Sequence, residues 1–254
     1  MAVQREPAAS PRVTPAVEFR NVSYTAGDTP VLRGVTLAVQ PGETLVLLGR
    51  SGSGKTTALK LINALLMPAS GEVRVAGQST TAWDPVRLRR RTGYVIQETG
   101  LFPHWTVAAN VGTVPRLEGW PPDRIAARTR ELLTLLHLPP DEYAGRFPHQ
   151  LSGGQRQRVG VARALAADPD LLLFDEPFGA LDPVTRTEVQ REFRTLVASL
   201  GKAAVFVTHD VREALLLATR IGLLRNGALE LVETPGNFRA SSHPEARAFL
   251  ECLQ

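Results

Sequence analysis

The sequence predicts an α/β fold in which a parallel sheet is interrupted by an inserted block of helices. Three observations lead to this prediction. The segment ETLVLLG (43–49) reads as a buried strand that delivers the glycine-rich GRSGSGKTT (49–57), and a helical pattern follows it. The apolar runs in DLLLFDE (170–176) and AAVFVTH (203–209) are typical of strands covered on both faces. Between about 97 and 168, strand signals nearly disappear and helical patterns replace them.

The N-terminal part is predicted to contain short strands on both sides of one buried helix. AVEFRNVSY (16–24) and VTLAV (35–39) have strand patterns, and GDTP (27–30) supplies a turn between them. Apolar residues from Lys55 to about Leu66 suit a helix that MPASG closes. EVRVAG and GYVIQ are expected to be further short strands.

Helix and strand patterns alternate in the rest of the chain. In the inserted block, the clearest expected helix runs from Asp123 to Leu136. Between the two apolar strands, one apolar stripe marks a helix and consists of Val189, Phe193, Leu196, Val197 and Leu200. This strand–helix–strand order favours a parallel sheet. IGLLRNGALELV is expected to form a hairpin turned at Asn226-Gly227, and a short helix is expected from about Pro244 to Cys252.

Length and composition describe a globular chain. Its 254 residues suffice for a full core, and 43% are hydrophobic and 21% charged. The apolar runs are far shorter than the ~20 residues that span a bilayer, so no membrane-crossing segment is expected. Residues 1–15 lack the apolar region of a secretory signal and are expected to be a disordered lead-in. A single cysteine, Cys252, agrees with a reducing compartment, and we expect a cytoplasmic location.

The charge distribution argues against a nucleic-acid partner. The formal charge is +4, and 26 of the 29 basic residues are arginines. The densest group of them consists of Arg87, Arg89, Arg90 and Arg91. A nucleic-acid interface needs basic charge gathered on one face, whereas here it is scattered among 25 acidic residues. A solvated surface explains this distribution better.

The segment GRSGSGKTT matches the phosphate-binding pattern G-x-x-x-x-G-K-[ST], and it has the expected context of a strand before it and a helix after it. Glycines at 52 and 54 let the backbone turn its N–H groups toward phosphate oxygens, and the helix start adds a positive dipole. Lys55 is expected to reach the β- and γ-phosphates of ATP, and Thr56 to ligate Mg²⁺. The predicted nucleotide contacts are Gly49, Arg50, Ser51, Gly52, Ser53, Gly54, Lys55, Thr56 and Thr57.

Two carboxylates end the apolar strand DLLLFDE, where an open α/β sheet presents its ligands. By position, Asp175 should hold the metal through water, and Glu176 should orient or deprotonate the attacking water. His209 ends the next apolar strand, so a parallel sheet would bring it to the same edge, within reach of a γ-phosphate. Local hydrogen bonding is the alternative role for this histidine.

Two further residues are candidates with a competing structural explanation. Gln97 follows the strand GYVI and could touch Mg²⁺ or the attacking water, and so report the nucleotide state to the helical block. A plain surface loop is the alternative. Tyr24 lies just ahead of TAGD and could stack on adenine, since an aromatic ring offers a flat face to a base. A core tyrosine is the alternative.

The segment LSGGQ (151–155) starts a second glycine-rich helix. Ser152 is a plausible N-cap, and Gly153 and Gly154 expose backbone N–H groups at the positive end of the helix. This makes an anion site without a lysine. Because it lies 96 residues after Thr56, two copies arranged head to tail would let each LSGGQ close over the γ-phosphate held by the other copy's Lys55.

This set of motifs resembles the nucleotide-binding subunits of ABC transporters from about residue 17 to 232. The motifs that carry the resemblance occur in order and are GRSGSGKTT, Gln97, LSGGQ, LLLFDEP, ALD at 180–182, and His209. The resemblance implies a P-loop NTPase fold with a RecA-like core, an antiparallel β subdomain and an inserted helical subdomain. It also implies that ATP joins two copies in a sandwich homodimer, with Gln155 part of the motif and Asp182 helping to connect the two sites. Tyr24 matches the aromatic residue that stacks on adenine.

The domain organisation that follows is a lead-in at 1–15, an ATPase domain at 16–235 with the helical subdomain at about 97–168, and a short helical tail at 236–254. In this family, the region after Gln97 receives a coupling helix from a membrane permease. The chain would then work at the cytoplasmic face of the membrane.

The sequence of the segment GYVIQETGLFPHWTV (93–107) is most similar to that of ATPases of bacterial importers of glycine betaine, choline and related quaternary amines. We therefore expect ATP hydrolysis that drives a permease supplied by a substrate-binding protein. An amino acid importer or a lipid or lipoprotein exporter is the alternative. A soluble ATP switch would show a coiled-coil insertion or a second ATPase unit, and neither is present in the sequence. Many of the osmoprotectant ATPases carry a C-terminal pair of regulatory domains, to which the resemblance does not extend.

Overall fold

The computed structural model describes residues 14–97, 100–179 and 181–253, and within them the strands form two sheets. The smaller sheet is antiparallel, with the order β2-β1-β4-β5. Its strands are β1 (Val17–Ala26), β2 (Thr29–Val39), β4 (Ser70–Val75) and β5 (Gln78–Ser79). The predicted lead-in falls largely on residues 1–13, which lie outside the described residues.

The larger sheet has the order β10-β9-β3-β8-β7-β6 and is parallel except for its edge strand β10. Its strands are β3 (Thr44–Leu48), β6 (Thr92–Val95), β7 (Leu171–Asp175), β8 (Ala203–Thr208), β9 (Arg220–Arg225) and β10 (Ala228–Glu233). Side chains alternate between two hydrophobic clusters: Leu171 and Leu173 belong to one, and Leu172 and Phe174 to the other. The prediction that these strands are covered on both faces is confirmed.

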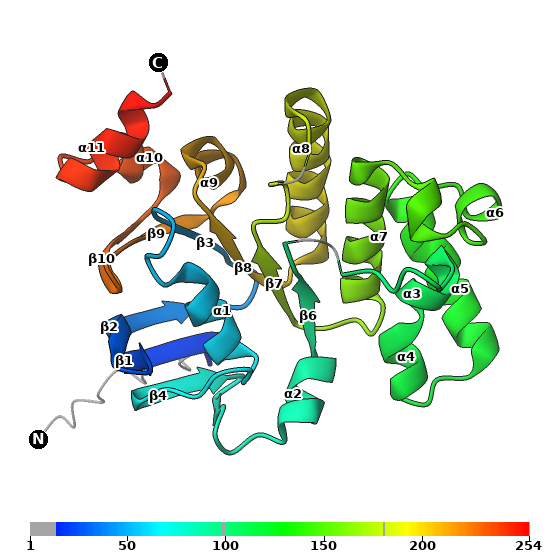
Figure 1. Cartoon of the computed structure of the whole chain (residues 1–254), viewed down its shortest axis with the longest axis horizontal. Coiled ribbons are helices and arrows are strands. Elements are labelled where there is room, and N and C mark those ends of the chain that lie inside the picture. Colours follow the sequence, from blue (N-terminus) through cyan, green and yellow to red (C-terminus); the bar gives the residue numbers. More distant parts are fainter. Residues whose placement is uncertain (1–13, 98–99, 180, 254) are drawn as a thin grey trace, which may run out of the picture.

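Helices cover both faces of the larger sheet (Figure 1). On one face, α1 (Lys55–Ile62) packs between the two sheets and contacts strands of both. On the other face lie α8 (Pro183–Leu200) and α9 (Val211–Leu217). A short helix, α2 (Pro85–Arg90), precedes β6. The loops that leave the carboxyl ends of the parallel strands therefore share one edge, which is where the predicted catalytic side chains occur.

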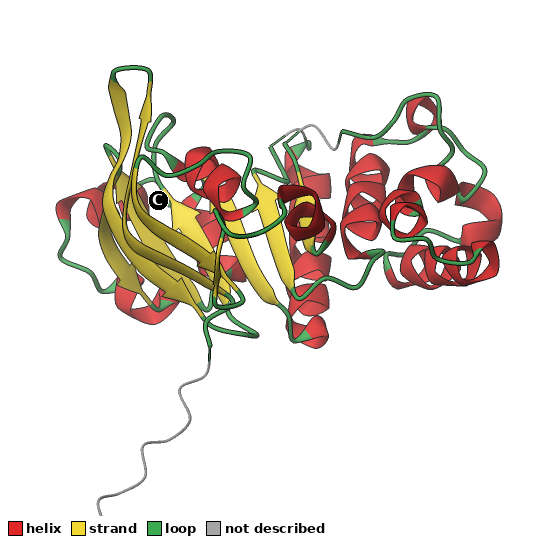
Figure 2. Ribbon diagram, turned by 90° about the horizontal axis from the view of Figure 1, so that it is seen from below, coloured by secondary structure: helices red, strands yellow, loops and turns green. Residues whose placement is uncertain are grey.

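In the described residues between β6 and β7, all regular secondary structure is helical. The helices are α3 (Val107–Val111), α4 (Thr113–Leu117), α5 (Pro122–Leu135), α6 (Pro140–Tyr143), the 3₁₀ turn η1 (Pro148–Gln150) and α7 (Gly153–Leu165). This helical lobe lies on the side of α8 away from the two sheets (Figures 1 and 2). Within the described residues, no helix is both long enough and apolar enough to cross a membrane.

The C-terminal elements follow the predicted hairpin closely. The turn at Asn226-Gly227 has positive φ at both residues, 49° and 82°, as a two-residue hairpin turn requires. Two helices follow, α10 (Pro235–Arg239) and α11 (Pro244–Glu251), of which the sequence predicted only the second. Phe238 and Ala246 are fully buried in the same cluster as the sheet, so both helices pack on the core.

Two predicted boundaries were wrong. The strand expected at 35–39 begins at Thr29, because the turn needs only Gly27 and Asp28 and the ladder resumes at once. The helix expected to reach Leu66 ends at Ile62. There the guanidinium of Arg89 donates to the carbonyl oxygens of Asn63 and Ala64 at 3.2 and 2.7 Å, a long-range contact that satisfies the helix end.

Candidate functional site

The phosphate-binding loop connects β3 to α1, as the motif predicts. Gly54, the residue before the helix, has a φ of 102°, which strongly favours glycine. Gly49 lies so close to the carbonyl oxygen of Leu224 and the hydroxyl of Ser53 that a Cβ atom would not fit. The loop is therefore held against the end of β9 by backbone contact, while Arg50, Ser51 and Gly52 are exposed at its tip.

The side chain of Lys55 is buried inside the loop. Its Nζ atom donates to the carbonyl oxygens of Gly49 and Arg50 at 2.8 and 2.9 Å, and lies 3.5 Å from Ser53 Oγ. Burial lowers the pKa of Lys55, and the carboxylates of Glu176 and Asp175 oppose that shift. The loop thus concentrates a cation among carbonyl oxygens that phosphate oxygens could replace as its partners. Thr57 follows at the start of α1 and is half-buried.

Thr56 and Asp175 meet although 119 residues separate them. The hydroxyl Oγ1 of Thr56 donates to Asp175 Oδ1 at 2.9 Å, and the hydroxyl of Tyr94 donates to Asp175 Oδ2 at 3.4 Å. Burial raises the pKa of Asp175, while the hydrogen bond from Thr56 lowers it. Burial also raises the pKa of Tyr94 strongly, so this phenol remains a hydrogen-bond donor. A hydroxyl beside a carboxylate offers the hard oxygen ligands that Mg²⁺ prefers, so these residues fit that ion.

Glu176 and His209 form the pair predicted at the same edge. His209 Nδ1 lies 3.1 Å from Glu176 Oε2, and the two side chains are 58% and 19% exposed. Glu176 has a φ of 44°, a left-handed conformation that costs roughly 1–3 kcal/mol in a non-glycine residue. Its backbone N–H donates to the carbonyl oxygen of Val207 at 3.0 Å, which holds it in this conformation. Strain of this kind is common where a side chain must point into a reaction site.

Behind His209 lies a buried hydrogen-bonded group that the sequence analysis missed. Thr208 Oγ1 donates to Glu213 Oε2 at 2.5 Å, and Gln190 Nε2 donates to Glu213 Oε1 at 2.9 Å. The backbone N–H of Asp210 donates to Thr208 Oγ1 at 3.0 Å. This group connects the strand end before His209 to the middle of α8. A glutamate three positions after Asp210 on a short helix gives no sequence signal of burial.

The two remaining candidates, Gln97 and Tyr24, lie on different elements. Gln97 is exposed and follows the end of β6 by two residues. Tyr24 is half-buried in β1 of the antiparallel sheet, where it is paired with Leu32 of β2. The side chain of Tyr24 packs partly against the hydrophobic cluster shared by the two sheets.

The LSGGQ segment forms the start of α7 in the helical lobe. Ser152 is the N-cap: its Oγ accepts from the backbone N–H of Gln155 at 3.3 Å, and the Gln155 side chain accepts from the backbone N–H of Ser152 at 2.9 Å. Gly153 is half-buried and Gly154 is buried, and the latter faces Thr185 at the start of α8 with no room for a larger side chain. Ser152 itself is exposed, so the predicted cap is confirmed and its outer face is open.

Asp182 begins α8 beside this helix start. Its Oδ1 accepts from the backbone N–H of Thr185 at 3.1 Å, and the hydrogen bonds from Thr185 lower the pKa of Asp182. In the predicted ALD motif, Ala180 lies outside the described residues. In the described parts of the chain, no hydrogen bond or ion pair joins the LSGGQ segment to the phosphate-binding loop.

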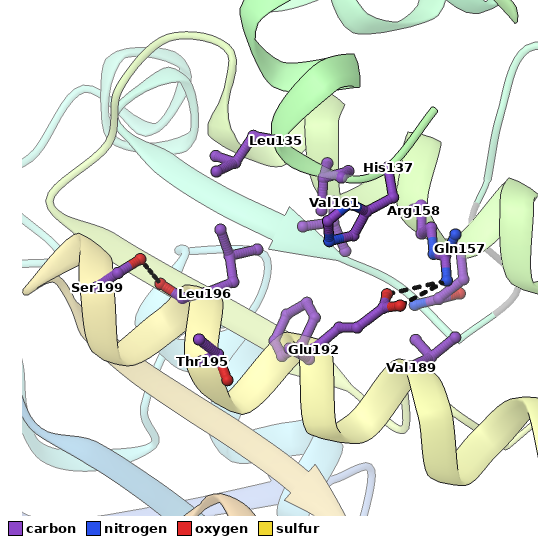
Figure 3. Close-up of a pocket in the computed structure, with 12 residues that line it drawn as sticks. Leu135, His137, Gln157, Arg158, Val161, Val189, Glu192, Thr195, Leu196 and Ser199 are labelled. Atoms are coloured by element: carbon purple, nitrogen blue, oxygen red, sulfur yellow. Dashed lines mark hydrogen bonds and ion pairs between the residues drawn. The ribbon is translucent and has the colours of Figure 1, made fainter. Parts of the chain in front are cut away.

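A separate cavity of about 350 Å³ lies between α8 and the helical lobe (Figure 3). The ion pair between Arg158 of α7 and Glu192 of α8 crosses it, with Nη2 and Oε2 2.9 Å apart. Apolar side chains such as Val161 and Leu196 form much of its wall. None of the predicted site residues lines this cavity, so it is distinct from the sheet edge where those residues meet.

Comparison with known proteins agrees with this arrangement. The family model described as ABC transporter matches residues 32–179. The chain belongs to the ABC transporter family. The dimeric post-hydrolysis structure of the ATP-binding cassette MJ0796, bound to ADP and phosphate, aligns with a TM-score of 0.76 and 35% identity. That alignment covers 86% of this chain and 98% of the cassette.

Curated relatives of this ABC transporter chain include two bacterial ATP-binding proteins of transport systems. The choline transport ATP-binding protein OpuBA of Bacillus subtilis is 50% identical over 85% of this chain and 57% of its own length. The glycine betaine uptake system ATP-binding protein YehX of Escherichia coli is 52% identical over 83% of this chain and 68% of its own length. The ABC transporter chain thus spans little more than half the length of the first of these relatives.

Proposed function

We propose that this chain is the ATP-hydrolysing subunit of a bacterial importer of glycine betaine, choline or a related quaternary amine. The observation that carries the hydrolytic part is the meeting of Lys55, the Thr56–Asp175 pair and the Glu176–His209 pair at one edge of the sheet. About half of all aligned positions are identical to those of a choline transport ATP-binding protein and a glycine betaine uptake system ATP-binding protein, which supports the choice of cargo class.

In the proposed reaction, the backbone N–H groups of residues 49–57 and the Lys55 ammonium bind the β- and γ-phosphates of ATP. Thr56 and Asp175 would hold Mg²⁺, with Gln97 as an additional oxygen ligand; when bound, the ion neutralises phosphate charge. Glu176 accepts a proton from the attacking water, and its left-handed backbone directs the carboxylate out of the strand end. His209 orients that carboxylate and contacts the γ-phosphate, and Tyr24 stacks on the adenine.

The Ser152 helix start would act on the nucleotide of a second copy. Its two glycines and the positive end of α7 make an anion site, and among the described residues no hydrogen bond or ion pair joins this site to the phosphate-binding loop of its own chain. Asp182, at the start of the neighbouring helix, would join the two composite sites. The dimeric arrangement described for the similar cassette MJ0796 supports this proposal.

The permease is proposed to dock on the helical lobe beside β6. Large apolar side chains are exposed there: Phe102 and Trp105 are 45% and 38% exposed, with ring centroids 4.6 Å apart, and Leu117 is 56% exposed. A cavity of about 260 Å³ lies beside Phe102, between Tyr94 and Val114. A short amphipathic helix of a membrane subunit would cover this surface. The chain would then lie at the cytoplasmic face of the membrane and act indirectly with a substrate-binding protein.

The proposal is tested by reconstitution. The purified chain should hydrolyse Mg²⁺-ATP, and together with its permease and binding protein in vesicles it should hydrolyse ATP faster when glycine betaine or choline is added outside. If an amino acid stimulated ATP hydrolysis instead, the chain would belong to an amino acid importer. An absence of ATP hydrolysis under both conditions would refute the enzymatic assignment.

A further inference from the structure

A carboxylate of the C-terminal helix α11 lies against the tip of the phosphate-binding loop. Glu245 Oε1 accepts from Arg50 Nε at 2.7 Å. The other oxygen, Oε2, lies 3.7 Å from Arg225 Nε at the end of β9. Glu245 is only 7% exposed, whereas the Arg50 side chain is 72% exposed. One buried carboxylate therefore holds an exposed arginine of the loop.

The burial of Glu245 makes this contact more significant than a surface ion pair. A buried charge is costly unless oppositely charged partners surround it, and a pair broken on one side leaves the other charge uncompensated. The two arginines supply that compensation from different elements. Arg225 also lies 3.7 Å from Glu230 of β10, whose second oxygen lies 3.3 Å from His243 Nε2 at the start of α11. The Arg50 contact is the end of this chain of charges that reaches the loop.

Apart from the Arg50–Glu245 pair, a few hydrogen bonds hold the tip of the loop. The carbonyl oxygen of Arg50 accepts from Lys55 Nζ at 2.9 Å and from the backbone N–H of Ser53 at 3.2 Å. The backbone N–H of Gly227, in the hairpin turn, donates to the carbonyl oxygen of Ser53 at 3.2 Å. If Lys55 turns toward phosphate when ATP binds, its bonds to the loop carbonyls are given up. The Arg50–Glu245 pair is a contact that can persist in both states.

We propose that Glu245 is a positioning residue that, through Arg50, keeps the phosphate-binding loop in the conformation that receives ATP. This inference rests on the proposed ATP-binding function and adds to it a role for α11. A cavity of about 290 Å³ separates the loop tip from the hairpin and α11, so without the ion pair the tip has room to move. A loop ordered before binding does not have to be ordered at the expense of binding energy. The effect should therefore appear in ATP affinity and not in the chemical step.

The test measures nucleotide affinity and turnover of Glu245→Gln in the full chain. With a fluorescent ATP analogue and Mg²⁺, we expect Kd to rise about three- to tenfold, which lies in the lower part of the coupling measured between residues in contact. The KM for ATP should rise in parallel, while kcat at saturating ATP stays within about twofold of the parent value. A variant that had merely lost stability would show a lower active fraction and a lower kcat with an unchanged KM.

Two further variants complete the test. Glu251→Gln removes the same charge from an exposed position of α11 and should leave ATP affinity unchanged. Arg50→Gln changes an exposed side chain and leaves Arg225 beside Glu245 as a compensating charge, so it should fold normally. It should reproduce the loss in Glu245→Gln and add no further loss in the double variant. Unchanged affinity in Glu245→Gln, or losses that multiply in the double variant, would overturn the inference. A parent chain that binds no ATP would instead refute the proposed function.

Discussion

The two glycine-rich helix starts differ in how the rest of the chain surrounds them. At the phosphate-binding loop, side chains from three separate strand ends converge. Tyr94 precedes the last residue of β6, Asp175 ends β7, and His209 follows β8. At the LSGGQ segment, the polar groups of Ser152 and Gln155 bond to each other and to Tyr143 of the same lobe. One region is a cluster built for a ligand, and the other is a capped helix with an open face.

This difference agrees with the division of labour between two chains that we propose. A helix start attracts anions because of its free N–H groups and its dipole, yet it cannot by itself hold a nucleotide and its metal. The LSGGQ segment therefore suits the closing of a pocket that another copy has already filled. Within one chain, α8 connects the two regions: Arg158 of α7 pairs with Glu192, and Gln190 bonds to the group behind His209.

The largest effect is expected when the proposed base, Glu176, is removed from the site beside the phosphate-binding loop. Glu176→Gln keeps the shape of the side chain and a hydrogen bond to His209 but accepts no proton, so the rate of ATP hydrolysis should fall about 10²- to 10⁴-fold. Binding should persist, and size-exclusion chromatography with Mg²⁺-ATP should show a stable dimer. Hydrolysis at the parent rate would show that Glu176 is not the base.

The comparison between the two regions is tested directly by mixing two inactive variants. Ser152→Asp retains a good N-cap but places a negative charge where the segment would meet phosphate, and Lys55→Ala disables the phosphate-binding loop. Each variant alone should be nearly inactive. In a random mixture, half of the dimers contain one intact composite site of two, so about a quarter of the parent activity should return.

Ser152→Asn is the matched control, since asparagine caps the helix as well as aspartate but carries no charge. It should retain most of the parent activity. A mixture that forms mixed dimers and stays inactive would mean that each LSGGQ segment serves its own chain's nucleotide.

A smaller effect is expected on binding when only the cation of the loop is lost. Lys55→Ala removes a buried charge-assisted contact to phosphate, a contact of about 1.5–3 kcal/mol, so ATP affinity should fall roughly 10- to 100-fold. Isothermal titration with Mg²⁺-ATP measures this change. Lys60→Ala, on the same helix but half-buried, is the control and should bind ATP as the parent does. Equal affinity in parent and Lys55→Ala would remove Lys55 from the phosphate site.

Much of the site could be predicted because local pattern and topology act in the same direction. Consecutive apolar residues in DLLLF and AAVFV require strands covered on both faces, and parallel strands bring their carboxyl ends to one edge. The meeting of Glu176 with His209 follows from that rule. The cap at Ser152 is local as well, since it depends on residues three positions apart.

What could not be predicted depends on contacts between distant residues. The position of Tyr94 beside Asp175 requires β6 to lie next to β7, although the whole helical lobe separates them in sequence. The early end of α1 depends on Arg89, and the support of the loop tip depends on Glu245. A single sequence gives no order of strands in a sheet and no partner for a given arginine, so these contacts appear only in three dimensions.

The smallest expected effect concerns the buried group that connects α8 with the strand end before His209. Burial raises the pKa of Glu213 above its ordinary value. The folded state therefore binds this proton more tightly than the unfolded chain does. This difference in proton binding adds to the free energy of unfolding. Its contribution is fully present below the pKa of the unfolded state, about 4.3, and is lost as the pH rises through the higher pKa of the folded state.

Glu213→Gln cannot titrate, so its free energy of unfolding should lack this loss. Relative to the parent, the variant should gain stability as the pH rises from about 4 toward neutrality, a trend that urea unfolding at several pH values measures. Glu188→Gln, at an exposed position of α8, should follow the parent at every pH. The same curve for Glu213→Gln and the parent would mean that Glu213 is ionised to the same extent in both states. If Glu213→Gln gains stability relative to the parent as expected, Glu213 retains its proton in the folded state above the pH at which the unfolded chain loses it. The link between α8 and His209 then carries no buried charge in that pH range, and hydrogen bonds alone couple the two regions.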